Sequence, residues 1–435
     1  MKLFRHSLCT ILAAFLVCSF YASGQKPALE ENRLETVTGI KVSQKNNPLA
    51  FPVARLGEAE ALELHFDELG GSVQTYYYSL TLCNADWVPA NLSPMDYLRG
   101  FTQNRITNYR AASGTQNRYV HYSALFPSSN SMPTKSGNYL LRVFKNGDTS
   151  KTVFTRRVLI ADFKSSVGAV VQQPFANQYF NTHQKVVVQI SPQGFALRNP
   201  ATEMIVQVMQ NNNWQSLREQ TQPSFIRGNT LEYSNEDKFV FEGGKEWRWL
   251  DLRSFRLQSD RVADVNYNVV PNHVFVVPDT VRSGIRYQFF RDINGAFQFG
   301  NLENINPYWQ SDYALVNFTF LPQDGYKEDM DYYLFGEFTG YQINDETRMK
   351  WNSEFNWLEA AMLLKNGFYN YAYVSVPKND KSALPSFAFT EGNRWETENN
   401  YRIMVYYRPF GARSDELIGV TEINSLNFLR SDIRQ

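Results

Sequence analysis

The chain alternates apolar and polar residues with a period of two along most of its length, and this pattern constrains its fold most. In ALELHFDEL (61–69), Leu62, Leu64 and Phe66 fall on one face of an extended strand, and polar side chains fall on the other. The segment YYYSLTLC (76–83) repeats the alternation with tyrosines and leucines. Because successive side chains of a strand point to opposite faces, such segments predict strands that cover an apolar core.

Turn signals separate these segments at short intervals. Asn146-Gly147 within YLLRVFKNGDTSKTVFTRRVLIA (139–161) and Asn294-Gly295 within IRYQFFRDINGAFQFGN (285–301) each predict a hairpin, because this dipeptide favours positive φ angles. No segment shows a capped period of 3.6 residues. The segment WLEAAMLLKNG (357–367) favours helix by propensity but lies among strands. The sequence therefore predicts an all-β protein of tandem immunoglobulin-like sandwiches.

Two polar joints divide the chain. The first, LIADFKSSVGAVVQQP (159–174), and the second, GNLENINPYWQSD (300–312), interrupt the runs of expected strands. We expect sandwich domains at residues 25–162, 163–308 and 309–435, each within the usual size range of a domain.

The first 24 residues have the features of a secretory signal peptide. A basic start with Lys2 and Arg5 precedes an apolar run from Leu8 to Phe20, and small residues follow at Ala22-Ser23-Gly24. The run is too short for a spanning helix. We expect export by the Sec route and cleavage before Gln25. An uncleaved membrane anchor and a lipoprotein processed at Cys18 are the alternatives.

Export would leave Cys83 as the single cysteine, because Cys9 and Cys18 lie in the signal peptide. An internal disulfide is then excluded, so stability must come from the core. Cys83 lies on an apolar expected strand with no histidine near it in sequence. We predict a buried packing residue; a reactive thiol or an intermolecular bridge is the alternative.

Charge excludes one class of partner. Without the signal peptide the chain carries 41 Lys and Arg against 43 Asp and Glu. Nucleic-acid binding requires a basic surface, so we expect none. Aromatic residues make up 15% of the chain, which suits strands and protein interfaces.

The sequence nominates no catalytic, cofactor or metal site. It lacks the local signatures of hydrolase elbows, zinc proteases and phosphate-binding loops. The four histidines outside the signal peptide are widely separated, which disfavours a zinc or haem site. We expect a protein that is not an enzyme. A periplasmic interaction protein, a carbohydrate-binding protein and an outer-membrane barrel remain as hypotheses, and strands that are apolar on both faces disfavour the barrel.

Several motifs occur in a family-specific order. They are LCNADW (82–87), YLRGF (97–101), YVHYSALFP (119–127), SGNYLLRV (136–143), WQSDYALVNFTF (309–320), YLFGEFTGY (333–341) and LLKNGFYNYAYV (363–374). In this order the chain resembles the plug proteins of the type IX secretion system, over about residues 27 to 430.

The resemblance implies a Sec-exported periplasmic protein that is peripheral to the outer membrane and does not span it. Its partner would be the large outer-membrane β-barrel translocon, whose periplasmic opening the protein would block sterically. The motif residues Cys83, Asn84, Asp86 and Trp87 would have a structural role in a turn that ends a strand.

The C-terminal part also resembles early-set sandwiches, which include glycogen-binding modules. That resemblance implies a strand at WLEAAMLL (357–364), against its helical propensity. It also nominates Trp351 and Trp357 as rings that could stack on glucose. A shared scaffold does not carry a shared function, so glycan binding stays the alternative to the plug.

Overall fold

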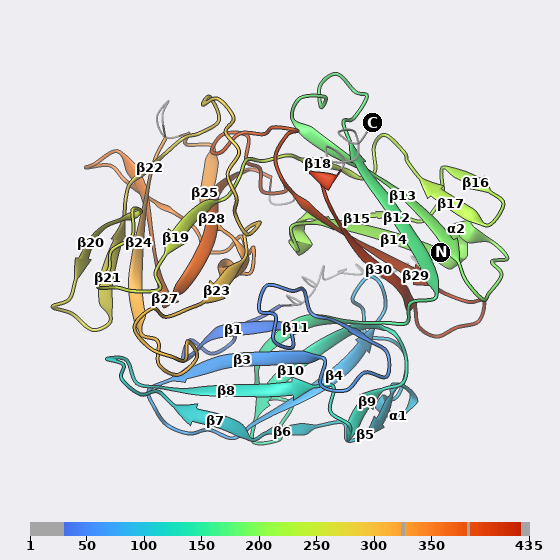
Figure 1. Ribbon diagram of the computed structural model, residues 1–435, viewed down its shortest axis with the longest axis horizontal. Helices are drawn as coiled ribbons and strands as arrows, with labels where there is room; N and C mark the ends of the chain where they lie inside the picture. The colour runs from blue at the N-terminus through green and yellow to red at the C-terminus, as the bar shows by residue number, and fades with distance from the viewer. Residues whose placement is uncertain (1–29, 323–326, 381–382, 428–435) are drawn as a thin grey trace, which may run out of the picture.

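The protein consists of three β-sandwiches arranged around a central space (Figure 1). The computed structural model describes residues 30–322, 327–380 and 383–427. The expected signal peptide, with Cys9 and Cys18, lies outside these residues. Short strands in several sheets dominate the chain, so the prediction of an all-β sandwich protein is confirmed.

The first sandwich contains residues 37–161 and packs two sheets face to face. One sheet has the order β1 (Val37–Gln44), β3 (Leu62–Leu69), β8 (Tyr119–Phe126), β7 (Asn108–Ala111). The other has the order β2 (Val53–Arg55), β11 (Thr152–Ala161), β10 (Gly137–Lys145), β4 (Tyr76–Cys83), β6 (Asn104–Ile106). A small ribbon beside them consists of α1 (Pro94–Tyr97), β5 (Leu98–Gly100) and β9 (Ser131–Pro133).

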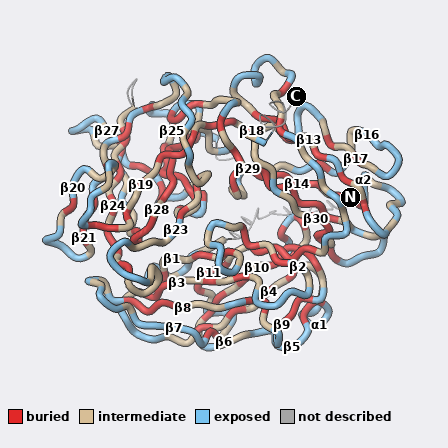
Figure 2. Tube along the Cα trace, in the orientation of Figure 1, coloured by how far each residue is buried: buried red, intermediate tan, exposed pale blue. Residues whose placement is uncertain are grey.

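The alternation in the sequence explains this core. The apolar positions of 61–69 and of 76–83 are buried and meet in one hydrophobic cluster between the two sheets. The hairpin of β10 and β11 turns at Asn146 and Gly147, which have φ angles of 57° and 73°, as predicted. Figure 2 shows buried residues concentrated inside the sandwiches and exposed residues in the outer loops.

The second sandwich combines strands from the middle and the end of the chain. Its first sheet contains β12 (Ser165–Gln172), β13 (His183–Pro192), β16 (Phe225–Arg227), β17 (Thr230–Tyr233) and β18 (Val240–Glu242). Its second sheet has the order β15 (Arg218–Gln220), β14 (Met204–Gln210), β29 (Asn400–Tyr407), β30 (Glu416–Asn424). The short helices α2 (Pro200–Glu203) and η1 (Trp214–Ser216) flank β14.

The third sandwich is inserted between those two parts of the second. One of its layers contains β19 (Arg248–Asp251), β28 (Gly367–Pro377), β23 (Phe297–Phe299) and β25 (Met330–Phe335). The other contains β20 (Val262–Asn266), β21 (Asn272–Val276), β22 (Asp279–Thr280), β24 (Tyr313–Leu321), β27 (Trp357–Lys365) and β26 (Lys350–Asn352). The helix η2 (Glu337–Thr339) follows β25.

These pairings correct the expected division at residue 308. β14 pairs with β29, so the last two strands complete the second sandwich, while β19 pairs with β28 in the third. The chain leaves the second sandwich after β18 and returns before β29. The two crossing segments touch: a Cβ on Gly243 would lie 2.0 Å from the Arg394 carbonyl oxygen. Strand pairing over more than 190 residues leaves no local signal, so a contiguous division was the wrong inference.

Two further local predictions have different outcomes. The segment 357–364 is part of β27, so the strand implied by the early-set resemblance is correct. The hairpin expected around Asn294-Gly295 is wrong. The turn forms, with φ angles of 53° and 79°, but residues 281–296 form an irregular loop, and β23 pairs with β28 instead. No helix among the described residues has the length and apolarity to cross a bilayer.

Candidate functional site

The motif LCNADW lies at the contact between the first and second sandwiches. Cys83, Ala85 and Trp87 are buried in a hydrophobic cluster with residues of β14, β29 and β30, among them Met209 and Tyr406. Burial raises the pKa of the Cys83 thiol to about 12, so the thiol is protonated at neutral pH. The motif therefore lies where two sandwiches meet, with its thiol buried in their contact.

Polar contacts fix the turn of the motif in place. The Asp86 carboxylate accepts from the Val88 amide at 3.0 Å, a local turn of the kind predicted. The Asn84 side chain instead accepts from the Asp415 amide at 3.3 Å, and the Asp415 carboxylate accepts from the Ala85 amide at 2.8 Å. Asp415 lies just before β30, so the turn is bound to the second sandwich.

Trp87 packs on the second sandwich, with a φ angle of 65°. Its ring meets the Trp214 ring edge to face at a centroid distance of 5.1 Å. The Arg157 guanidinium lies over both rings, 5.2 Å from Trp87 and 4.7 Å from Trp214. A cation between two indoles adds attraction to the apolar contact.

A buried polar network joins the first and third sandwiches. Asp67 on β3 accepts from His121 at 2.7 Å and from the Tyr313 hydroxyl at 2.5 Å, and it forms an ion pair with Lys365 at the end of β27. The Asp67 and Lys365 side chains are each 1% exposed. The polar face of β3 is thus covered by another sandwich, and its charges are matched there.

The same network contains two stacked histidines. His65 lies on Tyr308 at a centroid distance of 4.0 Å, and its Nδ1 is 3.1 Å from the His121 Nε2. An Asp–His pair occurs in hydrolases, where the histidine activates a nucleophile. Here the other ring nitrogen of His121 faces His65 and not a hydroxyl or thiol, and the Asp67 oxygens also bind Tyr313 and Lys365 across the contact between the two sandwiches.

Burial and neighbouring charge decide the ionisation of this network. Burial alone would raise the pKa of Asp67, but Lys365 and His121 hold that pKa below its ordinary value. Burial lowers the pKa of His121 despite the attraction of Asp67. Asp67 is therefore ionised and His121 neutral near pH 7.

Hydrogen bonds join the second and third sandwiches. The Tyr341 hydroxyl, after η2, donates to the Asn211 carbonyl, after β14, at 3.1 Å. The Ser386 hydroxyl donates to the Glu242 carboxylate at the end of β18 at 2.7 Å. Each pair of sandwiches is therefore joined by buried hydrogen bonds.

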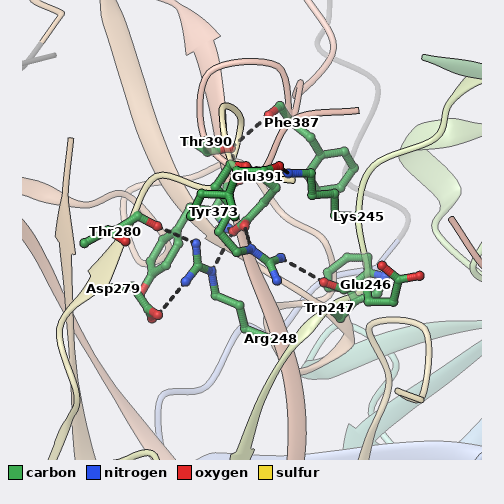
Figure 3. A network of polar contacts seen from close by, with 12 residues as sticks. Lys245, Glu246, Trp247, Arg248, Asp279, Thr280, Tyr373, Phe387, Thr390 and Glu391 are labelled. Carbon is green, nitrogen blue, oxygen red and sulfur yellow. Dashed lines mark hydrogen bonds and ion pairs between the residues drawn. The ribbon is translucent and has the colours of Figure 1, made fainter. Parts of the chain in front are cut away.

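Inside the third sandwich, Arg248 is held by two carboxylates (Figure 3). Its guanidinium donates to Asp279 at 2.5 Å, to Glu391 at 2.9 Å and to the Thr280 carbonyl at 2.7 Å. Burial would raise the pKa of Glu391, but Arg248 and Arg282 lower it to about 2. The charges are matched within the packed interior, which is typical of a structural network.

The three sandwiches enclose a central cavity of about 960 Å³. The first sandwich contributes Arg156 and Arg157, and the second contributes Arg402. The third contributes Asp292, whose pKa burial raises to about 7 with help from Glu398 and Glu246. The cavity is lined by residues of all three sandwiches and is the candidate site for a ligand.

The two nominated sugar-stacking residues do not form one platform. In the β26–β27 hairpin Trp351 pairs with Leu358, a buried core residue, whereas Trp357 pairs with Asn352. Cross-strand partners share a face, so the two tryptophans project to opposite faces. Trp357 stacks on Phe355 at a centroid distance of 4.6 Å.

The residues that join the sandwiches were not predicted from the sequence. Asp67, Lys365 and Arg157 carry no local motif; each is a charged residue on a strand that also carries core residues. Within the ranges that the structure describes, no three His, Cys, Asp or Glu side chains gather in a way that could hold a metal ion.

Comparison with known proteins supports the resemblance found in the sequence. Residues 37–162 match the family model described as the type 9 secretion system plug protein 1st domain. The chain is similar to a hypothetical protein from Parabacteroides merdae ATCC 43184 of known crystal structure, with 29% identity and a TM-score of 0.86. The similarity covers 91% of this chain and 98% of that chain. No curated protein matches the chain.

Proposed function

Because residues 37–162 match the family model of the type 9 secretion system plug protein 1st domain, we propose that this protein blocks the periplasmic opening of the outer-membrane translocon barrel. The protein would be exported to the periplasm and reach the outer membrane through that partner. Occlusion is steric and requires no catalytic group. It requires a body that keeps its shape against the opening.

The joints between the sandwiches are the observation that supports this mechanism. Each sandwich contacts the other two through buried side chains, from the cluster around Trp87 to the Asp67–Lys365 ion pair and the Tyr341–Asn211 hydrogen bond. A body closed on itself in this way resists bending at any single linker. A chain of sandwiches joined end to end would move about its linkers instead.

Exposed rings and basic side chains gather where the second and third sandwiches meet. The exposed apolar side chains are Phe175, Phe180, Ile285, Phe289, Leu384 and Phe389. Hydrogen bonds connect their loops: Lys245 donates to the Ile285 carbonyl at 2.7 Å, and Trp395 donates to the Asn181 carbonyl at 3.2 Å. Arg286 and Arg291 are exposed on the same irregular loop.

We assign the contact with the barrel to this surface. Apolar rings among basic groups suit a protein partner with acidic turns, because aromatic and arginine side chains dominate interface energetics. The double variant Phe289→Ala with Arg291→Ala should weaken capture of the barrel. The matched variant Phe410→Ala with Arg413→Ala, at the tip of the β29–β30 hairpin, should not.

Capture of the partner tests the proposed function directly. Tagged mature protein should retain a very large β-barrel from detergent-solubilised outer membrane. Capture that survives in the Phe289/Arg291 variant would reject the assigned surface and keep the plug. Failure of the wild-type protein to retain any barrel would reject the plug itself.

Leakage tests the mechanism separately from the partner. Cells that lack the protein should admit a normally excluded dye through the outer membrane when no cargo is in transit. An outer membrane that is no leakier after deletion would reject occlusion, even where the barrel is captured.

A further inference from the structure

Three ion pairs account for part of the charge around the central cavity. Arg33 pairs with Glu31, Lys41 with Glu337, and Arg402 with Glu422. Arg156 and Arg157, adjacent on β11, also line the cavity, but neither forms an ion pair with a carboxylate among the described residues. Both side chains thus line this cavity without an ion-pair partner among the described residues, Arg156 beside the Phe154 ring and Arg157 beside the Trp87 and Trp214 rings.

The contacts that these arginines do make leave most of their donors free. Arg156 donates to the carbonyls of Glu31 and Thr155, at 3.2 and 2.7 Å. Arg157 is held by the faces of Trp87 and Trp214, and its Nε has no acceptor among the residues described. The nearby Glu30 carboxylate accepts from the Arg157 backbone amide at 3.0 Å rather than from a guanidinium.

Two arginines in these surroundings lower the stability of the fold when no anion is bound to them. A buried donor with no acceptor destabilises the fold, and a partly buried charge without a counter-charge does so further. Burial lowers the pKa of both guanidiniums, while Glu30 opposes that change only in part. Arginine binds carboxylates through two parallel hydrogen bonds, which would satisfy the free donors.

The remaining walls indicate what carries the anion. Eight Asn and Gln side chains line the cavity, and the Asn294 side-chain oxygen has no donor among the described residues. Amides of this kind pair with peptide N–H and C=O groups. Glu30, Asp292, Glu346 and Glu398 also line the walls, which disfavours a doubly charged phosphate more than a singly charged carboxylate.

We propose that the central cavity binds the free C-terminal carboxylate of an extended peptide, with Arg156 and Arg157 supplying the positive charge of the wall that receives the carboxylate and the amide side chains pairing with the peptide backbone. Its volume of about 960 Å³ falls within the range of ligand pockets. Capture of a terminal carboxylate is an established mode of peptide recognition. This site does not depend on the proposed contact with a barrel.

The indole rings of Trp87 and Trp214, which pack on Arg157, provide a fluorescence reporter of ligand binding. Full-length mature protein should be titrated with N-acetylated tetra-alanine that carries a free carboxylate, while tryptophan fluorescence is recorded. We expect a saturable change, and affinity at least about tenfold weaker for the same peptide with an amidated end, because a charge-assisted hydrogen bond is lost. Equal affinities, or no response to the free acid, would overturn the proposal without any variant.

Variants and other anions complete the test. Arg157→Gln and Arg156→Gln should each abolish the response, whereas Arg227→Gln, on the exposed strand β16, should keep it. Folding of each variant is checked by its urea midpoint. A response that persists in Arg156→Gln and Arg157→Gln would overturn the site. If inorganic phosphate or acetate binds as tightly as the peptide, the assignment of a peptide ligand is rejected and the cavity is a simple anion site.

Discussion

The first sandwich is joined to its two neighbours by opposite kinds of contact. Toward the second sandwich, it presents a contiguous motif whose buried side chains are apolar, around Cys83 and Trp87. Toward the third, it presents polar side chains from separate strands, among them Asp67 and His121, and Asp67 pairs with Lys365 of the third sandwich. The first contact gains stability from removal of apolar surface, and the second depends on matched charge and hydrogen-bond geometry.

This difference teaches how each joint fails. An apolar contact loses stability in proportion to the surface removed, so truncation weakens it gradually. A buried ion pair fails abruptly when one partner is lost, because the other charge stays buried and unpaired. The joint with the third sandwich is therefore more sensitive to a single change of charge and to acid.

The largest effect is expected from Lys365→Ala. Removal of the ammonium leaves the Asp67 carboxylate buried without its ion-pair partner, which should cost about 3–5 kcal/mol of unfolding free energy. Urea denaturation measures the loss, and hydrogen exchange should increase first in β24 and β27. Adding Asp67→Asn should restore part of the stability, because the unpaired charge is then gone.

A surface ion pair provides the matched control for that variant. Lys164→Ala breaks a pair with Asp162, where the lysine side chain is 47% exposed. We expect a loss of about 0–1 kcal/mol. Losses of equal size at Lys164 and Lys365 would contradict the distinction between the two joints.

Trp87→Ala should weaken the apolar joint by about 3–4 kcal/mol, in the lower part of the range for a buried aromatic truncated to alanine. The ring is 4% exposed and packs on Trp214. Hydrogen exchange should increase in β14 and β30, and not in β24 and β27. An increase spread equally over both joints would show that they are not independent.

Substitutions of Cys83 distinguish a packing role from a chemical role at the joint between the first and second sandwiches. Cys83→Ala should cost about 1 kcal/mol through lost packing. Cys83→Ser should cost more, about 1–3 kcal/mol, because it buries a hydroxyl beside apolar side chains. Urea midpoints measure both losses, and capture of the barrel should be unchanged. Loss of capture in a variant of normal stability would restore the thiol as a functional group.

Acid should weaken the charged joint more than the apolar one. Burial holds the pKa of His121 below its ordinary value, so the unfolded chain binds a proton more readily than the folded chain. That stability is present above about pH 6.5 and is lost as pH falls through the folded pKa, at up to about 1.4 kcal/mol per pH unit.

Urea midpoints between pH 7.5 and 5.5 measure this slope. The groups facing His121 are Asp67, Lys365, His65 and Tyr308. His121→Asn should flatten the slope, and His273→Asn, on a strand of the third sandwich away from this network, should leave it unchanged. A slope that survives in His121→Asn would assign the acid sensitivity to another group.

The smallest effect is expected at Trp357, which lies in neither joint. Trp357→Ala on the outer face of its hairpin should change stability by no more than about 0.5 kcal/mol. Titration of the wild-type protein with α-glucan should leave tryptophan fluorescence unchanged. A sub-millimolar response that disappears in Trp357→Ala would favour the glycan-binding alternative.

Local patterns were sufficient for the strands and most turns. The alternation at 76–83 predicted both β4 and the side chains in its core, and Asn146-Gly147 predicted the hairpin of β10 and β11. Propensity failed at 357–364, where a strand forms because tertiary pairing with β24 outweighs a small preference for helix. Helix and strand propensity also could not show that residues 281–296 remain irregular, because this loop makes its hydrogen bonds with distant segments.

The sequence by itself determined the class of the protein: apolar side chains at every second position can be buried only by sheets packed face to face. Only the tertiary structure decided that the last strands return to the second sandwich, that Asp67 meets Lys365, and that Arg156 and Arg157 face a shared cavity. The reason is physical. Alternation is a property of neighbouring residues, whereas the pairing of charges and strand edges depends on groups that only the folded chain brings together.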